Sequence, residues 1–69
     1  MNERLIRMKD VMRITGLSRS RIYQYIAEDK FPDSVSIGGR SVAWVESEVY
    51  QWVESVIGRR ESSLLYGYR

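Results

Sequence analysis

Two arginines lie at the start of a segment that is predicted to be a helix, where the helix itself does not favour a cation. In the stretch GLSRSRIYQYI, Arg19 and Arg21 follow Ser18, a residue type that commonly caps a helix N-terminus. The N-terminal end of a helix carries partial positive charge, so cations there are mildly destabilising. The pattern therefore predicts that something outside the chain binds these two side chains.

A third cation, Arg40, follows two glycines that are expected to form the turn of a β-hairpin. The tip of a hairpin offers little internal packing, so we expect Arg40 to face a partner as well. Hydroxyl and amide groups on the side of the predicted helix away from its apolar stripe complete the set. The candidate binding residues are Ser18, Arg19, Ser20, Arg21, Tyr23, Gln24 and Arg40.

Charge is unevenly distributed along the 69 residues, although the net charge is only +2. Residues 1–27 hold six basic and two acidic residues, whereas residues 28–57 hold two basic and six acidic residues. Residues 58–69 hold three basic residues and one acid. A basic first part beside an acidic part predicts a polarised surface with one face for an anionic partner, and the alternative is solvated charge without a partner.

Composition argues against several classes of function. The chain has no Cys and no His, so neither a disulfide nor a zinc site with the usual ligands is expected. It also lacks a phosphate-binding glycine loop, and we expect no catalytic site, no cofactor and no small-molecule substrate. No apolar run approaches the length of a membrane span, and the start MNERLIRM is too charged for a signal peptide. We therefore expect a cytoplasmic protein.

The elements that position these residues can be predicted from apolar spacing. MKDVMRIT places apolar residues at helical spacing over residues 8–15, and Gly16 is expected to end that helix in a left-handed conformation. From the cap at Ser18, a second helix is predicted over about residues 19–28, with Ile22, Tyr25 and Ile26 on its apolar stripe. Two short helices joined by a turn containing glycine form a helix-turn-helix pattern.

A β-hairpin is predicted next, because SVSI and SVAW alternate on either side of Gly38-Gly39. That turn would pair Val35 with Val42, both facing inward, and Ile37 with Arg40. A third helix follows and is predicted to end at Gly58. Its core face would comprise Val49, Trp52, Val53, Val56 and Ile57.

The order helix, turn, helix, hairpin, helix predicts a mainly α fold with a small β-hairpin, a winged helix-turn-helix. We expect one domain over residues 1–58 and a tail over residues 59–69 that is either flexible or an interaction segment. In such folds the second helix enters the major groove of duplex DNA. Arg19 and Arg21 would then meet phosphates or guanine edges, and Arg40 a phosphate or the minor groove.

The segments RLIRMKDVMRITGLSRSRIYQYI, FPDSVSIGGRSVAW and ESEVYQWV occur in an order that resembles the AlpA-like phage regulatory proteins, within the excisionase and MerR-like winged helices. The resemblance covers about residues 4–57. It implies a DNA-binding protein of a prophage or integrated element that regulates transcription, assists an integrase in excision, or does both. It also implies further copies binding side by side on DNA. The tail lies outside the resemblance, and its apolar cluster of Leu64, Leu65 and Tyr66 alone suggests the hypothesis of a contact between copies or with the integrase. At Arg21 the chain departs from many relatives, which carry a small hydroxyl residue there.

Plainer interpretations stay open for several of these residues. In place of a contact with DNA, Arg21 could form an ion pair with a nearby acid. Tyr23 could cover the edge of the core, and Gln24 could simply be a good helix former. Tyr25 is expected in the core, as are Trp44 and Trp52. The alternative function is a protein-interaction module that uses the acidic third helix to bind a regulator or an integrase.

Overall fold

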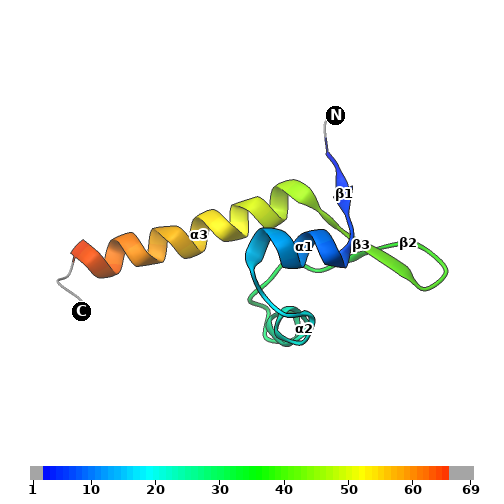
Figure 1. Ribbon diagram of the computed structural model, residues 1–69, viewed down its shortest axis with the longest axis horizontal. Helices are drawn as coiled ribbons and strands as arrows, with labels where there is room; N and C mark the ends of the chain where they lie inside the picture. The colour runs from blue at the N-terminus through cyan, green and yellow to red at the C-terminus, as the bar shows by residue number, and fades with distance from the viewer. Residues whose placement is uncertain (1–2, 66–69) are drawn as a thin grey trace.

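Two short helices, a small sheet and one long helix make up the protein (Figure 1). The computed structural model describes residues 3–65, and the side chains of residues 3–60. The elements in chain order are β1 (Leu5–Ile6), α1 (Met8–Thr15), α2 (Arg19–Ala27), β2 (Val35–Gly38), β3 (Ser41–Val45) and α3 (Glu46–Leu65). This arrangement confirms a mainly helical, winged helix-turn-helix fold.

The connection between α1 and α2 has the predicted chemistry. Gly16 has φ of 77°, a left-handed conformation that glycine adopts without steric cost, and its N–H donates to the Met12 carbonyl at 2.8 Å. Ser18 is the N-cap of α2, and its Oγ accepts a hydrogen bond from the Arg21 N–H at 3.1 Å. The Leu17 N–H is satisfied by Thr15 Oγ1 at 3.2 Å. These bonds fix the angle at which α2 leaves α1.

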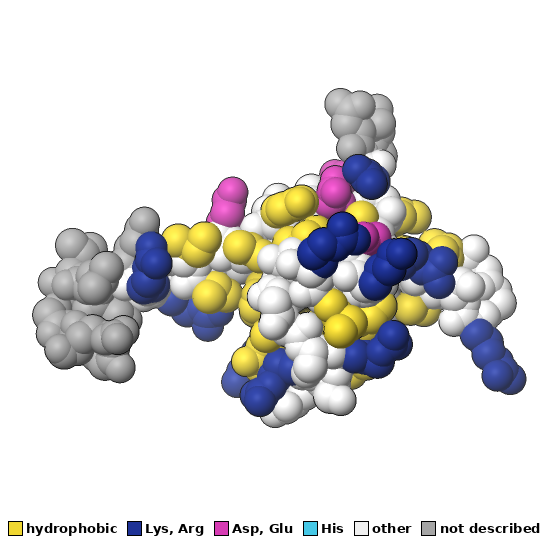
Figure 2. All heavy atoms as spheres, in the orientation of Figure 1, with side chains coloured by type: hydrophobic (Ala, Val, Ile, Leu, Met, Phe, Trp, Pro, Cys, Tyr) yellow, Lys and Arg dark blue, Asp and Glu magenta, His cyan; other side chains and the backbone are white. Residues whose placement is uncertain are grey.

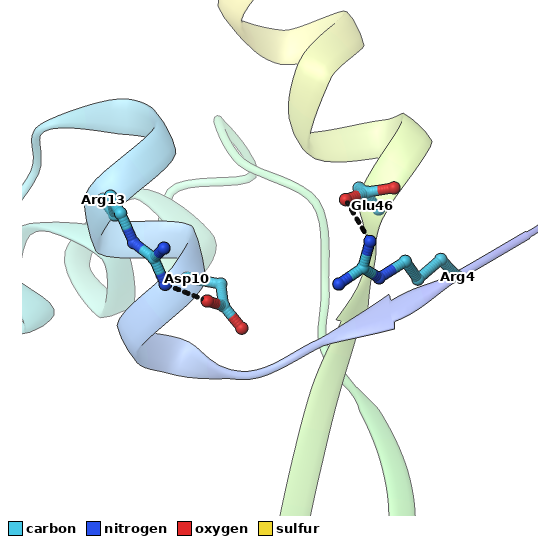
Figure 3. Close-up of polar contacts among 4 residues, drawn as sticks. All are labelled: Arg4, Asp10, Arg13 and Glu46. Carbon is cyan, nitrogen blue, oxygen red and sulfur yellow. Dashed lines mark hydrogen bonds and ion pairs between the residues drawn. The ribbon is translucent and has the colours of Figure 1, made fainter.

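The sheet has three antiparallel strands in the order β1-β3-β2, so the hairpin is joined by a strand from the start of the chain. Leu5 pairs with Val45 and Ile6 with Trp44. The Glu46 N–H then donates to the Arg4 carbonyl at 2.7 Å, and the side chains of these two residues form an ion pair at 3.9 Å (Figure 3). β1 was not predicted from the sequence, because two residues are too few to show alternation.

The predicted pairing within the hairpin was wrong. Val35 pairs with Ala43, Ser36 with Val42 and Gly38 with Ser41, which leaves Ile37 unpaired in an irregularity of the ladder. Because this bulge uses one extra residue on β2, the two-residue connection moves from Gly38-Gly39 to Gly39-Arg40.

The inward orientation predicted for the hairpin was also wrong in part, since Val35 is exposed. On β3, Ala43 and Trp44 are both fully buried, although they are neighbours and were predicted to face opposite ways. β3 is the central strand and also contacts α1 and α3, so simple alternation between core and solvent does not hold for it.

The core gathers around Trp44, Ile22, Val11 and Val49, none of which has exposed surface. The Trp44 indole N–H donates to the Pro32 carbonyl at 3.1 Å. The Trp52 indole N–H donates to the Lys30 carbonyl at 2.7 Å, and its ring is half-buried. The two tryptophans therefore hold the segment between α2 and β2 against the helices and the sheet.

The third helix is longer than predicted, because α3 continues through Gly58 to Leu65. Gly58 is not among the described glycines with positive φ, and a glycine inside a helix costs only about 1 kcal/mol relative to alanine. Val56 and Ile57, which were predicted to be core residues, are 36% and 44% exposed. The side chains of Leu64 and Leu65, and all of Tyr66, lie outside the described part of the chain. Within the described residues, no helix is long and apolar enough to cross a membrane.

Candidate nucleic-acid interface

α2 is divided lengthwise into a buried and an exposed side. Ile22 is fully buried, and Tyr25 and Ile26 are half-buried against the core cluster, as their spacing predicted. The polar candidates lie off this stripe, and all of them are exposed: Ser18, Arg19, Ser20, Arg21, Tyr23 and Gln24. The helix thus presents a polar, cationic side to solvent from its first residue.

The candidate arginines have no carboxylate partner within the described part of the chain. The ion pairs found there join Arg4 to Glu46, Arg13 to Asp10 and Lys30 to Glu28 (Figure 3 draws the first two). Arg19, Arg21 and Arg40 take part in none of them, although all three are charged and exposed. Their charge is therefore available to an external anion.

Arg21 nevertheless has an internal contact, because its guanidinium lies 5.8 Å from the centre of the Tyr25 ring. At an exposed position such a cation–π contact contributes about 0.5–1 kcal/mol. Gln24 is similarly engaged, since its Nε2 donates to Glu28 Oε2 at 3.3 Å. Arg19 has no such contact among the described residues, so it is the less restrained of the two arginines at the start of α2.

Tyr23 connects α2 to the sheet. Its ring lies 6.5 Å from the Trp44 ring at an interplanar angle of 58°, while 46% of the residue stays exposed. Trp44 itself is fully buried on β3, the strand that leads away from the hairpin tip. Tyr23 therefore both covers the edge of the core and keeps surface in solvent beside Arg19, so the two interpretations left open for it are compatible.

The hairpin carries Arg40 at its tip. Arg40 follows Gly39 in the two-residue connection and is exposed. Figure 2 shows Lys and Arg side chains over α1, on both sides of α2 and at the far end of the hairpin, whereas the acidic side chains on this face lie mostly toward β1 and α3. The charge imbalance read from the sequence is thus also an imbalance in space.

Two further exposed cations lie at the start of α1 and were not among the candidates. Arg7 is the N-cap residue of α1 and Lys9 lies in its first turn, and neither joins an ion pair among the described residues. Arg13, on the same helix, is bound by Asp10. Asp10 is three residues from Arg13 and also three residues from Arg7, so this spacing alone could not show from the sequence which of the two arginines it binds.

The fold and this surface define a class of protein: a small winged helix-turn-helix whose second helix and hairpin expose arginines that no described carboxylate binds. The profile of the family described as "Prophage CP4-57 regulatory protein (AlpA)" matches residues 4–57. The chain belongs to this family of phage regulatory proteins. The matched range covers β1 to the middle of α3 and includes every candidate binding residue.

Two relatives illustrate the similarity. The chain is 48% identical over 59 residues to "Uncharacterized protein ORF88" of Enterobacteria phage P4, a match that covers 86% of this chain and 67% of the relative. It is 30% identical over 56 residues to "DNA-binding transcriptional activator AlpA" of Escherichia coli (strain K12), covering 72% of this chain and 80% of the relative.

Proposed function

We propose that this protein binds double-stranded DNA in a sequence-specific manner, with α2 in the major groove and the hairpin on the adjacent backbone or minor groove, and that it thereby regulates phage or prophage transcription. The observation that carries the proposal is the exposed side of α2, on which Arg19 begins the helix without a carboxylate partner in the described part of the chain. In helix-turn-helix proteins the N-terminal residues of the second helix reach the base edges. The printed function of the Escherichia coli relative, a DNA-binding transcriptional activator, supports the same assignment.

The residues divide by role. In this proposal Arg19 donates two hydrogen bonds to a guanine edge, and Gln24 supplies the amide that suits adenine once it leaves Glu28. Ser18, Ser20 and Tyr23 offer exposed hydroxyl groups that could donate hydrogen bonds to phosphate oxygens. Arg21 contributes charge from its position over Tyr25, and its contact with DNA competes with that ring.

The hairpin supplies the second point of attachment. Its connection is two residues long and ends in Arg40, which is exposed and therefore accessible to a phosphate. Packing of Tyr23 on Trp44 ties the orientation of α2 to β3, and hence to the hairpin. Because α2 and the hairpin are held at a fixed angle, having both in contact with the DNA favours one position of the protein along the duplex.

Phosphate contacts should give much of the affinity. Each neutralised phosphate contributes about −0.9 to the slope of log K against log salt concentration, so about four contacts give a slope of roughly −3 to −4. One module of this size buries about 600–1,000 Å² of protein surface on DNA. Tight binding is therefore expected to need more than one copy on adjacent sites.

A role in excision is a second use of the same surface, predicted from the family resemblance, in which the protein would act with an integrase in the bacterial cytoplasm. The two roles differ in readout. A reporter fused to the bound promoter measures regulation of transcription. An integrase-dependent assay on the attachment site measures excision.

The test is selection of genomic duplex fragments by the purified protein at two salt concentrations, followed by footprinting of the enriched site. We expect one enriched sequence, bound more tightly at low salt. Arg19→Ala should lose about tenfold or more in affinity and relax the preference at one base pair, since a bidentate base contact contributes about 1–3 kcal/mol of discrimination.

The matched control is Arg13→Ala, which removes an exposed cation that Asp10 already binds. It should select the same sequence with an affinity within about threefold of the wild type, the change expected for one lost surface charge. The proposal fails if Arg19→Ala keeps the same site at the same affinity, or if no duplex is bound at low salt. Binding that survives Arg19→Ala, with regulation that is abolished by changes in Glu48 and Glu54, would favour the protein-interaction module instead.

A further inference from the structure

The second half of α3 extends away from the other elements (Figure 1). α3 has 20 residues, and a helix of that length spans about 30 Å. Its first half is held by the core, with Val49 fully buried and Trp52 half-buried. On the following turns the apolar stripe continues into solvent, because Val56 is 36% exposed and Ile57 is 44% exposed.

Such a segment is poorly stabilised on its own. Helices shorter than about 12–15 residues are marginal in water without tertiary packing, and Gly58 adds about 1 kcal/mol of unfavourable propensity. A groove of about 450 Å³ runs beside this half, between Val56 and Ile57 on one side and Ile14, Leu17 and Tyr25 on the other. The stripe and the groove together form an apolar surface that a partner would cover.

Arg60 indicates what that partner carries. It follows Ile57, Val56 and Val53 by three, four and seven residues, so it lies on the same stripe of the helix. A cation within an apolar stripe needs a carboxylate at the same place on the covering surface, because a desolvated charge is costly when unpaired. Glu54, next to Val53 and two residues before Val56, is an exposed acid near the middle of α3.

A second copy of the chain provides that carboxylate when the two helices run antiparallel. With a two-fold axis between Val56 and Ile57, Val56 of each copy packs against Ile57 of the other copy. Arg60 then falls opposite Val53 of the second copy, within side-chain reach of its Glu54. A parallel arrangement would instead bring Arg60 against Arg60, and antiparallel packing also aligns the two helix dipoles favourably.

We infer that the second half of α3 is a self-association surface, through which two copies pack antiparallel by Val56 and Ile57, with Arg60 of each paired to Glu54 of the other. Such an isologous contact is closed, so it yields a dimer rather than a filament. The inference does not depend on DNA binding. One helix face is a small interface, so the dissociation constant is expected between about 1 µM and 1 mM.

The test is sedimentation equilibrium of the full chain without DNA, over a wide range of protein concentration. The wild type should fit a monomer–dimer equilibrium, and Ile57→Asn should be monomeric. Glu54→Arg and Arg60→Glu should each weaken the dimer about tenfold, since two symmetry-related ion pairs become repulsive. The double variant should return to within about threefold of the wild type, the result that identifies a direct pairing.

Glu48→Arg is the matched control, because Glu48 is an exposed acid on the first half of the same helix and should leave association unchanged. Circular dichroism of each variant checks that the core, which contains none of the changed side chains, remains folded. A wild-type chain that stays monomeric at about 1 mM overturns the inference. That result would favour an acidic segment of another protein as the occupant of the groove, because Lys30 and Arg59 line it. Three other results would also overturn the inference. They are a dimer that persists in Ile57→Asn, a double variant whose dimer affinity is not restored, and a Glu48→Arg variant whose dimer is as weak as that of Glu54→Arg.

Discussion

Replacing Arg40 by alanine separates the contribution of the hairpin to DNA affinity from its contribution to the fold. Arg40 is exposed at the tip, and none of the described carboxylates pairs with it. The substitution therefore removes no internal contact of the described structure. We expect the free energy of unfolding to change by less than about 0.5 kcal/mol, the usual range for surface substitutions.

The effect on DNA binding can be worked out from one lost phosphate contact. A single contact changes the slope of log K against log salt concentration by about 0.9. Between 50 and 200 mM salt, a fourfold change, the wild type should therefore lose about 3.5-fold more affinity than Arg40→Ala. The sequence preference should stay the same, because a phosphate contact carries no direct sequence information.

The assay is fluorescence anisotropy of the labelled site, titrated at four or more salt concentrations, with Arg13→Ala as the charge-matched control. The control should keep the wild-type slope, since Asp10 already holds that guanidinium. Equal slopes for Arg40→Ala and the wild type would refute a phosphate contact by the hairpin. A changed base preference in Arg40→Ala would show that the hairpin reads bases instead.

The remaining predictions concern the scaffold, each measured by urea or thermal unfolding. Ser18→Ala removes the cap of α2 and should lower the free energy of unfolding by about 1 kcal/mol and Tm by about 4–8 °C. Gly16→Ala should lower the free energy of unfolding by about 1 kcal/mol or more, because φ is 77° there, although no atom lies within 4 Å of the added Cβ. Gly58→Ala is equally open but has no positive φ, so it should raise the free energy of unfolding by up to about 1 kcal/mol. A change of the same sign in both variants would contradict the assigned conformations. Trp44→Phe should cost about 2 kcal/mol, since it loses ring volume and leaves the Pro32 carbonyl without its donor, and an unchanged stability would show that this bond contributes little.

The helix-turn-helix could be predicted from the sequence because its signals are local. Gly16 needs a positive φ, Ser18 needs the N–H of Arg21, and Ile22 lies on a stripe with helical period. Each of these depends on residues within four positions of one another, and the structure confirms all three. The exposure of the candidate residues on α2 follows from the same stripe.

The first strand and the register of the hairpin depend on contacts between residues distant in the sequence. These features, and the length of α3, could not be predicted from local patterns. Leu5 and Ile6 become a strand only because β3 offers them an edge. The bulge at Ile37 shifts the hairpin connection by one residue, and two adjacent glycines tolerate either position. Gly58 resembles a helix end in sequence, yet its backbone stays helical, and so the surface formed by the second half of α3 could not be foreseen.

The most direct test of the account is an NMR titration of the ¹⁵N-labelled protein with the selected duplex. We expect the largest amide shifts on Ser18 to Gln24 of α2 and on Gly39 and Arg40 of the hairpin, with little change at Val56 and Ile57 at protein concentrations below self-association. Shifts confined to α3, or no shift of the α2 amides at saturating DNA, would contradict it.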